Sequence, residues 1–294
     1  MKRIILLLNL VMVVTGSWCQ NTYSGGKVMD NLSIKSTIMA KDVKYSVYLP
    51  PDYDASNRSY PVVYLLHGYT DDQTGWVQFG QIGTLVDVAI AEQKLCPMII
   101  IMPDGGVTWY VNDYLNKVRF EDMIFQEFIP AIEQKFRIVK KKEFRGIAGL
   151  SMGGFGSFYL SLKHPDMFAA CAPLSAGVFT DKEITEMPDD DYRNVFGPIY
   201  GDNNGNDRLT EHWRKTNILD VIKNIPEADK KKVKIYMDCG DKDFLIRGNC
   251  ETHLLLTDLK IPHEFRVREG VHNWEYWREG IVDALAFIAQ SFTR

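Results

Sequence analysis

The sequence predicts an α/β fold in which one mostly parallel β-sheet is doubly wound, with helices on both faces. Two observations carry this prediction. Short apolar runs that suit strands alternate along most of the chain with segments that place apolar residues at helical spacing, and such alternation indicates a parallel sheet. The central runs are also continuously apolar, which is typical of strands covered on both faces.

The elements follow in order along the chain. Residues 44–49 alternate polar and apolar side chains before two prolines and are expected to form an edge strand. The continuous runs 62–66 and 98–102 predict buried strands, and helical spacing predicts helices over residues 82–93 and 121–136. Further strands are expected at residues 144–148, 169–174, 233–237 and 264–267, and further helices at 153–162, 253–259 and 282–292.

Residues 178–215 break this alternation. The segment is rich in Asp and Asn, and we interpret it as a solvated excursion over the carboxyl ends of the strands, where parallel sheets bind ligands. A run that begins at Asp202 resembles a calcium loop, but Asp207 stands where the loop needs glycine and Trp213 where it needs glutamate. No metal site is expected.

The N-terminus has the pattern of a secretory signal. Two basic residues precede an apolar run at residues 4–14 and small residues at 15–17. The run is too short for the roughly 20 residues that a membrane span needs. We expect a signal peptide over residues 1–19, a single domain over residues 20–294, and a secreted or periplasmic product that begins at Gln20. A lipid-modified Cys19 is the alternative, which the bulky Trp18 disfavours.

Charge and cysteine content exclude several classes of protein. The formal net charge is −4 and no basic run occurs, so no nucleic-acid partner is expected. The cysteines beyond residue 19 match neither a zinc pattern nor a disulfide scaffold. Cys171 lies in an apolar stretch and is expected to be buried. The sequence does not decide whether Cys239 and Cys250 form a disulfide.

One motif predicts the chemistry. Residues 149–153 read Gly-Leu-Ser-Met-Gly between a predicted strand and a predicted helix. This is the strand–turn–helix context in which a nucleophilic serine stands on a strained turn, and Ser151 is the expected nucleophile. Gly149 and Gly153 supply the room that such a turn requires. The amino terminus of the following helix favours developing negative charge.

A serine nucleophile needs a base and an acid, which follow it along the chain in this arrangement. His272 lies in a loop between the strand at 264–267 and the last helix and is the expected base, whereas His263 precedes that strand at the wrong end. The acid is expected in the loop after the strand at 233–237. Composition does not choose between Asp241 and Asp243, and position in the loop slightly favours Asp243.

Two backbone amides are needed to bind the oxyanion of the tetrahedral intermediate. One is expected from Met152, the residue after the nucleophile. The other is expected from Tyr69, in the turn that follows the strand at 62–66. His67 would then support this turn instead of transferring protons.

The sequence resembles the esterase D-like branch of the α/β-hydrolases, which includes the feruloyl and acetylxylan esterases of carbohydrate esterase family 1. The resemblance covers most of residues 20–294 and implies that Asp243 is the acid and that Tyr69 and Met152 are the oxyanion donors. The motifs that carry it are Leu65-Leu66-His67-Gly68, Pro103-Asp104-Gly105, Phe120-Glu121, Glu127-Phe128-Ile129-Pro130, residues 146–154, Cys239-Gly240-Asp241-Lys242-Asp243-Phe244-Leu245 and Gly270-Val271-His272-Asn273-Trp274.

The expected function is that of a secreted serine carboxylic ester hydrolase that works through an acyl-enzyme without a cofactor or metal. The resemblance favours feruloyl or acetyl esters of plant cell-wall polysaccharide, either as small molecules or linked to the polymer. Trp76, Trp109, Tyr110 and Trp274 flank the motifs, and Trp109 and Trp274 are the candidates for substrate contact, although each one fits a packing role equally well. The alternatives are an acyltransferase, a general small-acyl esterase, and a catalytically silent glycan-binding protein, which the complete set Ser151, Asp243 and His272 disfavours.

Overall fold

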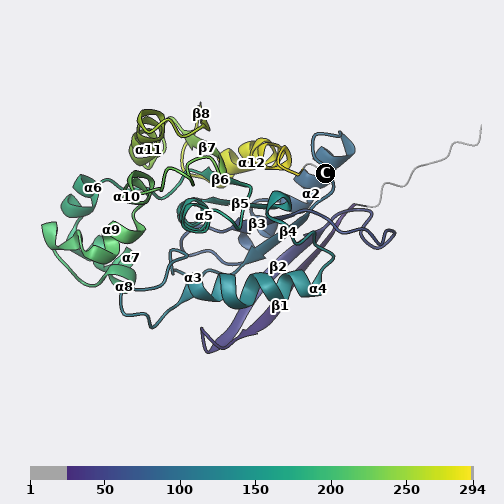
Figure 1. The fold of residues 1–294 in the computed structure, drawn as a ribbon, viewed down its shortest axis with the longest axis horizontal. Coiled ribbons are helices and arrows are strands. Elements are labelled where there is room, and N and C mark those ends of the chain that lie inside the picture. The colour runs from purple at the N-terminus through teal and green to yellow at the C-terminus, as the bar shows by residue number, and fades with distance from the viewer. Residues whose placement is uncertain (1–24, 293–294) are drawn as a thin grey trace, which may run out of the picture.

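The computed structural model describes residues 25–292, so the predicted signal peptide at residues 1–19 lies outside the described part. These residues form an eight-stranded sheet in the order β1-β2-β4-β3-β5-β6-β7-β8, flanked by helices on both faces (Figure 1). The strands are β1 (Lys27–Ser36), β2 (Lys41–Leu49), β3 (Val62–Leu66), β4 (Ile99–Pro103), β5 (Arg145–Leu150), β6 (Ala170–Leu174), β7 (Lys234–Gly240) and β8 (His263–Arg268). All pairs from β4 to β8 are parallel, which confirms the predicted α/β fold.

Two apolar clusters cover the two faces of this sheet. One contains the helical segment 120–135 and α5 (Met152–Lys163). The other contains α2 (Ile82–Ala91) and α12 (Trp274–Ala289), which lie together on the opposite side in Figure 1. The segment 120–135 comprises α3 (Phe120–Met123), a π-helical turn (Ile124–Phe128) and α4 (Ile129–Lys135). Apart from the helices of residues 181–216, the other helices are α1 (Gly75–Gln78), a 3₁₀ turn (Lys142–Phe144), α10 (Ile218–Lys223) and α11 (Ile246–Asp258).

The prediction of an edge strand at residues 44–49 is wrong. This strand, β2, pairs antiparallel with β4 on one side and with β1 on the other, so β1 is the edge. The sequence of β1 did not predict a strand, because most of its side chains are exposed or half-buried and its pairing register shifts between Met29 and Leu32. Main-chain hydrogen bonds to β2 hold it in place.

The interpretation of residues 178–215 as a solvated excursion also needs correction. The segment forms α6 (Asp181–Glu186), α7 (Asp189–Val195), α8 (Gly197–Tyr200), a 3₁₀ turn (Gly205–Arg208) and α9 (Glu211–Thr216). We call residues 181–216 the cap; its helices gather at one end of the molecule (Figure 1). Tyr192, Phe196, Tyr200 and Trp213 are buried inside it. Its polar residues form the outer surface of a small helical unit that has an aromatic interior.

Three other features bear on the predictions. Cys171 is fully buried, as expected. Cys239 and Cys250 are free thiols, as are the other cysteines of the described part, so the structure does not adopt the disulfide. Within residues 25–292, no helix combines the length and apolar character needed to cross a membrane.

Candidate active site

Ser151 lies on a sharp turn between β5 and α5. Its backbone has φ 55° and ψ −117°, a conformation that is strained for a residue with a side chain. The flanking glycines explain how the turn closes: a Cβ atom on Gly149 would clash with the main chain of Gly153, and one on Gly153 would clash with the main chain of Leu66 and His67. The turn therefore presents the serine hydroxyl at the carboxyl edge of the sheet.

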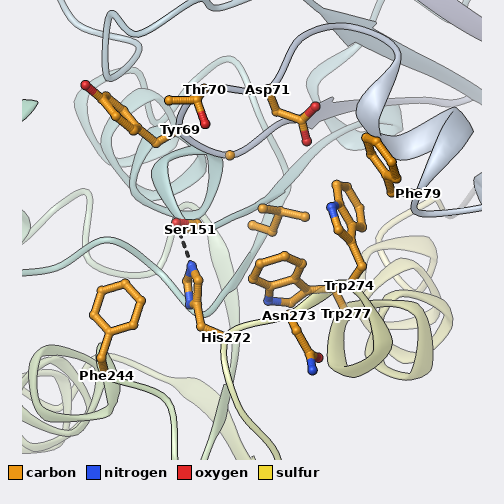
Figure 2. A pocket seen from close by; sticks show the side chains of 12 residues that line it. Tyr69, Thr70, Asp71, Phe79, Ser151, Phe244, His272, Asn273, Trp274 and Trp277 are labelled. Atoms are coloured by element: carbon orange, nitrogen blue, oxygen red, sulfur yellow. Dashed lines mark hydrogen bonds between the residues drawn. The ribbon is translucent and has the colours of Figure 1, made fainter.

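The loops after β7 and β8 bring an acid and a base to this serine. His272 Nε2 lies 2.9 Å from Ser151 Oγ, and Figure 2 draws this contact. On the other side of the ring, His272 Nδ1 lies 2.9 and 3.0 Å from the two carboxylate oxygens of Asp243. The structure thus brings together Ser151, Asp243 and His272.

Asp241 has a different position. Its carboxylate accepts a hydrogen bond of 2.9 Å from the Gly270 amide, and its own amide donates to the Arg268 carbonyl at 2.9 Å. The Lys242 amide adds a bond to the Gly270 carbonyl. Asp241 therefore ties the two loops together and does not contact the imidazole.

The Asp243 carboxyl group is a buried anion. Its residue is 2% exposed, and this burial would by itself raise its pKa, but hydrogen bonding and the charge of His272 together with the Leu245 amide lower the pKa below its ordinary value. An ionised Asp243 accepts the Nδ1–H of His272, which leaves Nε2 as the acceptor for the Ser151 hydroxyl. The arrangement can therefore remove a proton from the serine.

The two predicted oxyanion donors both lie close to Ser151, Met152 because it is the next residue in the chain and Tyr69 because the fold brings it there. Met152 is the first residue of α5, and Tyr69 follows β3 and shares a pocket wall with Ser151. Within residues 25–292, neither backbone amide donates to a protein acceptor. An unpaired amide at the start of a helix, such as that of Met152, suits an anion.

His67 joins two of the turns around the site. It is 1% exposed, its Nδ1 donates to the Gly68 carbonyl at 2.8 Å, and its Nε2 accepts from the Gly105 amide at 2.8 Å. The Tyr110 hydroxyl donates to the His67 carbonyl at 2.9 Å. These bonds hold the Tyr69 turn against the turn after β4, which agrees with a supporting role for His67.

Two pockets meet at Ser151, and Tyr69 and Phe244 also line both of them. The first, which we call the Trp274 pocket, has a volume of about 620 Å³ and includes Asp71, Phe79, His272, Trp274 and Trp277 in its wall. The second, the Trp109 pocket, has a volume of about 550 Å³ and includes Trp109, Phe179, Met187, Phe196 and Leu245. Figure 2 shows Tyr69 and Phe244 on one side of Ser151 and Trp274 and Phe79 on the other.

The four flanking aromatic residues divide into two groups. Trp76 and Tyr110 are fully buried and donate to the main chain of Leu66 and His67, so they are structural. Trp109 and Trp274 line pockets, but different ones. The two tryptophans therefore do not form a single binding surface.

Several pocket residues were not among the sequence candidates. Phe244 is 68% exposed although it directly follows Asp243, and its ring lies 4.6 Å from that of His272. Trp277 packs edge-on against His272 at 4.8 Å. Asp71 points into the Trp274 pocket, across from Trp274 (Figure 2). For Phe244 and Trp277, a signal was their closeness in sequence to the predicted acid and base.

The parallel sheet and the order of the three loops along the chain place this protein among the α/β-hydrolases. The model of the Esterase family, described as "Putative esterase", matches residues 36–288. The chain therefore belongs to this esterase family, and it is a hydrolase that acts on ester bonds.

Its relatives include esterases of two acyl specificities. An acetyl esterase from Caldicellulosiruptor saccharolyticus is 26% identical over 88% of this chain and 97% of that protein. An endo-1,4-beta-xylanase/feruloyl esterase from Xylanibacter ruminicola is 34% identical over 48% of this chain, which corresponds to 20% of that longer protein.

Solved structures that are similar to this chain include esterases and serine hydrolases. A ferulic acid esterase superposes with a TM-score of 0.77 at 30% identity and covers 92% of this chain and 99% of its own. A fluorophosphonate-binding serine hydrolase from Staphylococcus aureus has a TM-score of 0.75 at 24% identity over 90% of this chain and 99% of its own. At this lower identity the likeness concerns the fold.

Proposed function

We propose that this protein is a serine esterase that removes feruloyl or acetyl groups from polysaccharide through an acyl-enzyme on Ser151. The observation that carries the proposal is the contact chain Ser151–His272–Asp243 at the junction of two pockets. An ester that lies across this junction places its acyl group in one pocket and its alcohol in the other.

The mechanism uses this chain's own residues. Ser151 Oγ attacks the ester carbonyl while His272 Nε2 takes its proton, and Asp243 stabilises the imidazolium that forms. The amides of Tyr69 and Met152 bind the oxyanion. His272 then returns the proton to the leaving alcohol. In the second half of the reaction His272 takes a proton from water as the water attacks the acyl-enzyme, and it passes this proton to Ser151 Oγ when the bond between Oγ and the acyl group breaks.

The position of His272 supports an assignment of the two pockets to the two halves of the ester. The leaving alcohol takes its proton from His272, so it lies in the pocket that His272 lines, which is the Trp274 pocket. There Asp71 offers hydrogen-bond acceptors to sugar hydroxyls. The acyl group then occupies the Trp109 pocket, whose wall contains Trp109, Phe179 and Phe196. A planar feruloyl ring suits such an aromatic wall.

This assignment predicts different effects for the two tryptophans. Trp109→Ala is expected to lower kcat/KM for methyl ferulate by about two- to tenfold, the equivalent of one aromatic contact of ~0.5–1.5 kcal/mol, and to leave an acetyl ester less affected. Trp274→Ala should instead lower the rate on a feruloylated oligosaccharide more than the rate on methyl ferulate. Steady-state kinetics with the three esters measure both ratios.

Each of these variants is the control for the other, because both remove an indole from a pocket wall. Trp109 is 4% exposed and packed against Phe155 and Phe196, so the melting temperature of each variant must accompany its kinetics. If acetyl esters are preferred and both variants leave the ratios unchanged, the aromatic residues serve packing and the protein is a small-acyl esterase.

Export is part of the proposal and rests on the sequence of residues 1–19. The exported protein is expected to begin at or near Gln20 and to carry no lipid, because the basic pair and the short apolar run favour cleavage as a secretory signal. Mass spectrometry of the intact protein from the exported fraction measures this. A diacylglycerol mass on Cys19 would place the enzyme on a membrane surface instead.

A further inference from the structure

Arg208 lies inside the cap with its side chain fully buried. Its guanidinium donates to three main-chain carbonyls: from Nη1 to Ile184 at 2.9 Å and Met187 at 2.6 Å, and from Nε to Asn203 at 3.0 Å. Nη2 forms an ion pair with Asp189. Burying a charged group away from water costs free energy. For the Arg208 guanidinium, this cost is offset mainly by the hydrogen bonds to three backbone carbonyl oxygens.

Three of these partners, Ile184, Met187 and Asp189, lie at the facing ends of two helices that shape the Trp109 pocket. Ile184 belongs to the last turn of α6 and Met187 directly follows it, while Asp189 begins α7. The last residue of α6, Glu186, and the short connection to α7, Met187 and Pro188, belong to the pocket wall. Arg208 thus binds the main chain of Met187, which itself lines the proposed acyl pocket, and of Ile184, which precedes the wall residue Glu186 by two positions.

The other end of α7 is tied to the catalytic loops. The Tyr69 hydroxyl donates to the Asn194 carbonyl at 3.1 Å, and Trp109 Nε1 donates to the Val195 carbonyl at 3.3 Å. Helix α7 is therefore held at its start by Arg208 and at its end by the loops after β3 and β4. The attachment at Arg208 does not involve the loops after β3 and β4, so it can be changed without altering residues next to Ser151.

We propose that Arg208 is a positioning residue for substrate specificity: it holds the α6–α7 connection as the wall of the Trp109 pocket, so that large acyl groups bind while small ones do not depend on it. This inference rests on the proposed function, because it takes the Trp109 pocket to be the acyl site. It makes the cap a specificity element whose geometry depends on one buried cation.

Arginine is the residue type that this position needs. A planar guanidinium offers five N–H donors in fixed directions, whereas a lysine ammonium offers three on a flexible stem. The ring of Tyr192 lies 4.3 Å from the guanidinium carbon and adds a cation–π contact on one face. Lysine at this position would keep the charge and lose the simultaneous contacts with Ile184, Met187 and Asn203.

The test compares one bulky and one small ester in a set of variants. Arg208→Met is expected to raise KM for methyl ferulate about tenfold with kcat little changed. The pocket wall contacts the acyl group equally in the ground state and the transition state, and the loss of such contacts affects KM alone. The rate on an acetyl ester should stay within about twofold, because that acyl group does not reach the cap wall. Arg208→Lys and Asp189→Asn should shift KM in the same direction by less.

Arg193→Met is the matched control. Arg193 lies in the same helix α7, is half-exposed, pairs with Asp190 and Asp202, and is not part of either pocket wall. Its replacement should leave both esters unaffected. Equal losses on both esters in Arg208→Met would show a general role in stability and overturn the inference, as would an unchanged KM for methyl ferulate. If Arg208→Met does not fold, the milder variants decide by the same criteria.

The wild-type enzyme separates this inference from the proposed function. A wild-type rate on methyl ferulate that is below the rate on the acetyl ester contradicts the feruloyl assignment. An aromatic preference that is present in the wild type and persists in all Arg208 and Asp189 variants contradicts the positioning role alone.

Discussion

Replacing Ser151 with alanine is expected to lower kcat for any activated ester by about 10⁶-fold, the size of the loss when the nucleophile of a serine hydrolase is removed. The variant retains both pockets and both oxyanion amides but has no group that can form the acyl-enzyme. Within residues 25–292, no other serine and no cysteine lines either pocket. Initial rates with p-nitrophenyl acetate, together with labelling by a fluorophosphonate probe, measure the effect.

Ser157→Ala is the matched control for this experiment. Ser157 lies on the same helix α5, and its buried hydroxyl donates to the Gly154 carbonyl at 2.8 Å, away from both pockets. This variant should keep its activity and its labelling. Probe labelling that survives Ser151→Ala would mean that another residue is the nucleophile.

The centre of the fold was predictable from the sequence because its strands are buried on both faces. The residues of β3, β4, β5 and β6 are all buried, and the continuous apolar runs of β3 and β4 are strong local signals. Strand β1 is defined chiefly by its main-chain pairing with β2, because its side chains other than Ser36 are exposed or only partly buried, and side-chain patterns do not report main-chain pairing. The error about β2 follows from this, since a strand is an edge only if it has a neighbouring strand on one side alone, and β2 has β4 on one side and β1 on the other.

The cap escaped prediction for a different reason. Its helices are short, with six residues in α6 and seven in α7, so each one gives few repeats of an apolar pattern. Tyr192, Phe196 and Tyr200 recur at intervals of four residues and are buried together, but aspartates and asparagines surround them in the sequence. Arg208, which organises this unit, has the sequence appearance of an exposed residue.

One part of the candidate site was predictable from the sequence and another part was not. The contacts of Ser151, His272 and Asp243 were predictable because each residue stands at the end of a recognisable strand and a parallel sheet brings such ends together. The pockets were not, because their walls combine residues that are distant in sequence. Trp109 and Trp274 are alike in sequence context, and only the three-dimensional arrangement assigns them to opposite sides of Ser151.

Asp243→Asn is expected to lower kcat by about 10⁴-fold, as the equivalent change does in a serine protease. An asparagine amide can donate to His272 Nδ1, which would place the ring proton on Nε2 and leave no acceptor for the Ser151 hydroxyl. Asp241→Asn should cost far less, because the Asn side-chain oxygen can still accept the 2.9 Å bond from the Gly270 amide, and a neutral bond of this kind contributes about 1 kcal/mol.

The two substitutions are a closely matched pair, since they remove one charge each from positions two residues apart in the same loop. Asp243 is 2% exposed and contacts His272 at 2.9 Å, whereas Asp241 is exposed and contacts a backbone amide. Both variants should remain folded and keep fluorophosphonate-accessible pockets, so pre-steady-state acylation rates can be compared directly. If Asp241→Asn proved the more damaging change, the loops would rearrange when substrate binds, and Asp241 would have to take over the orientation of His272.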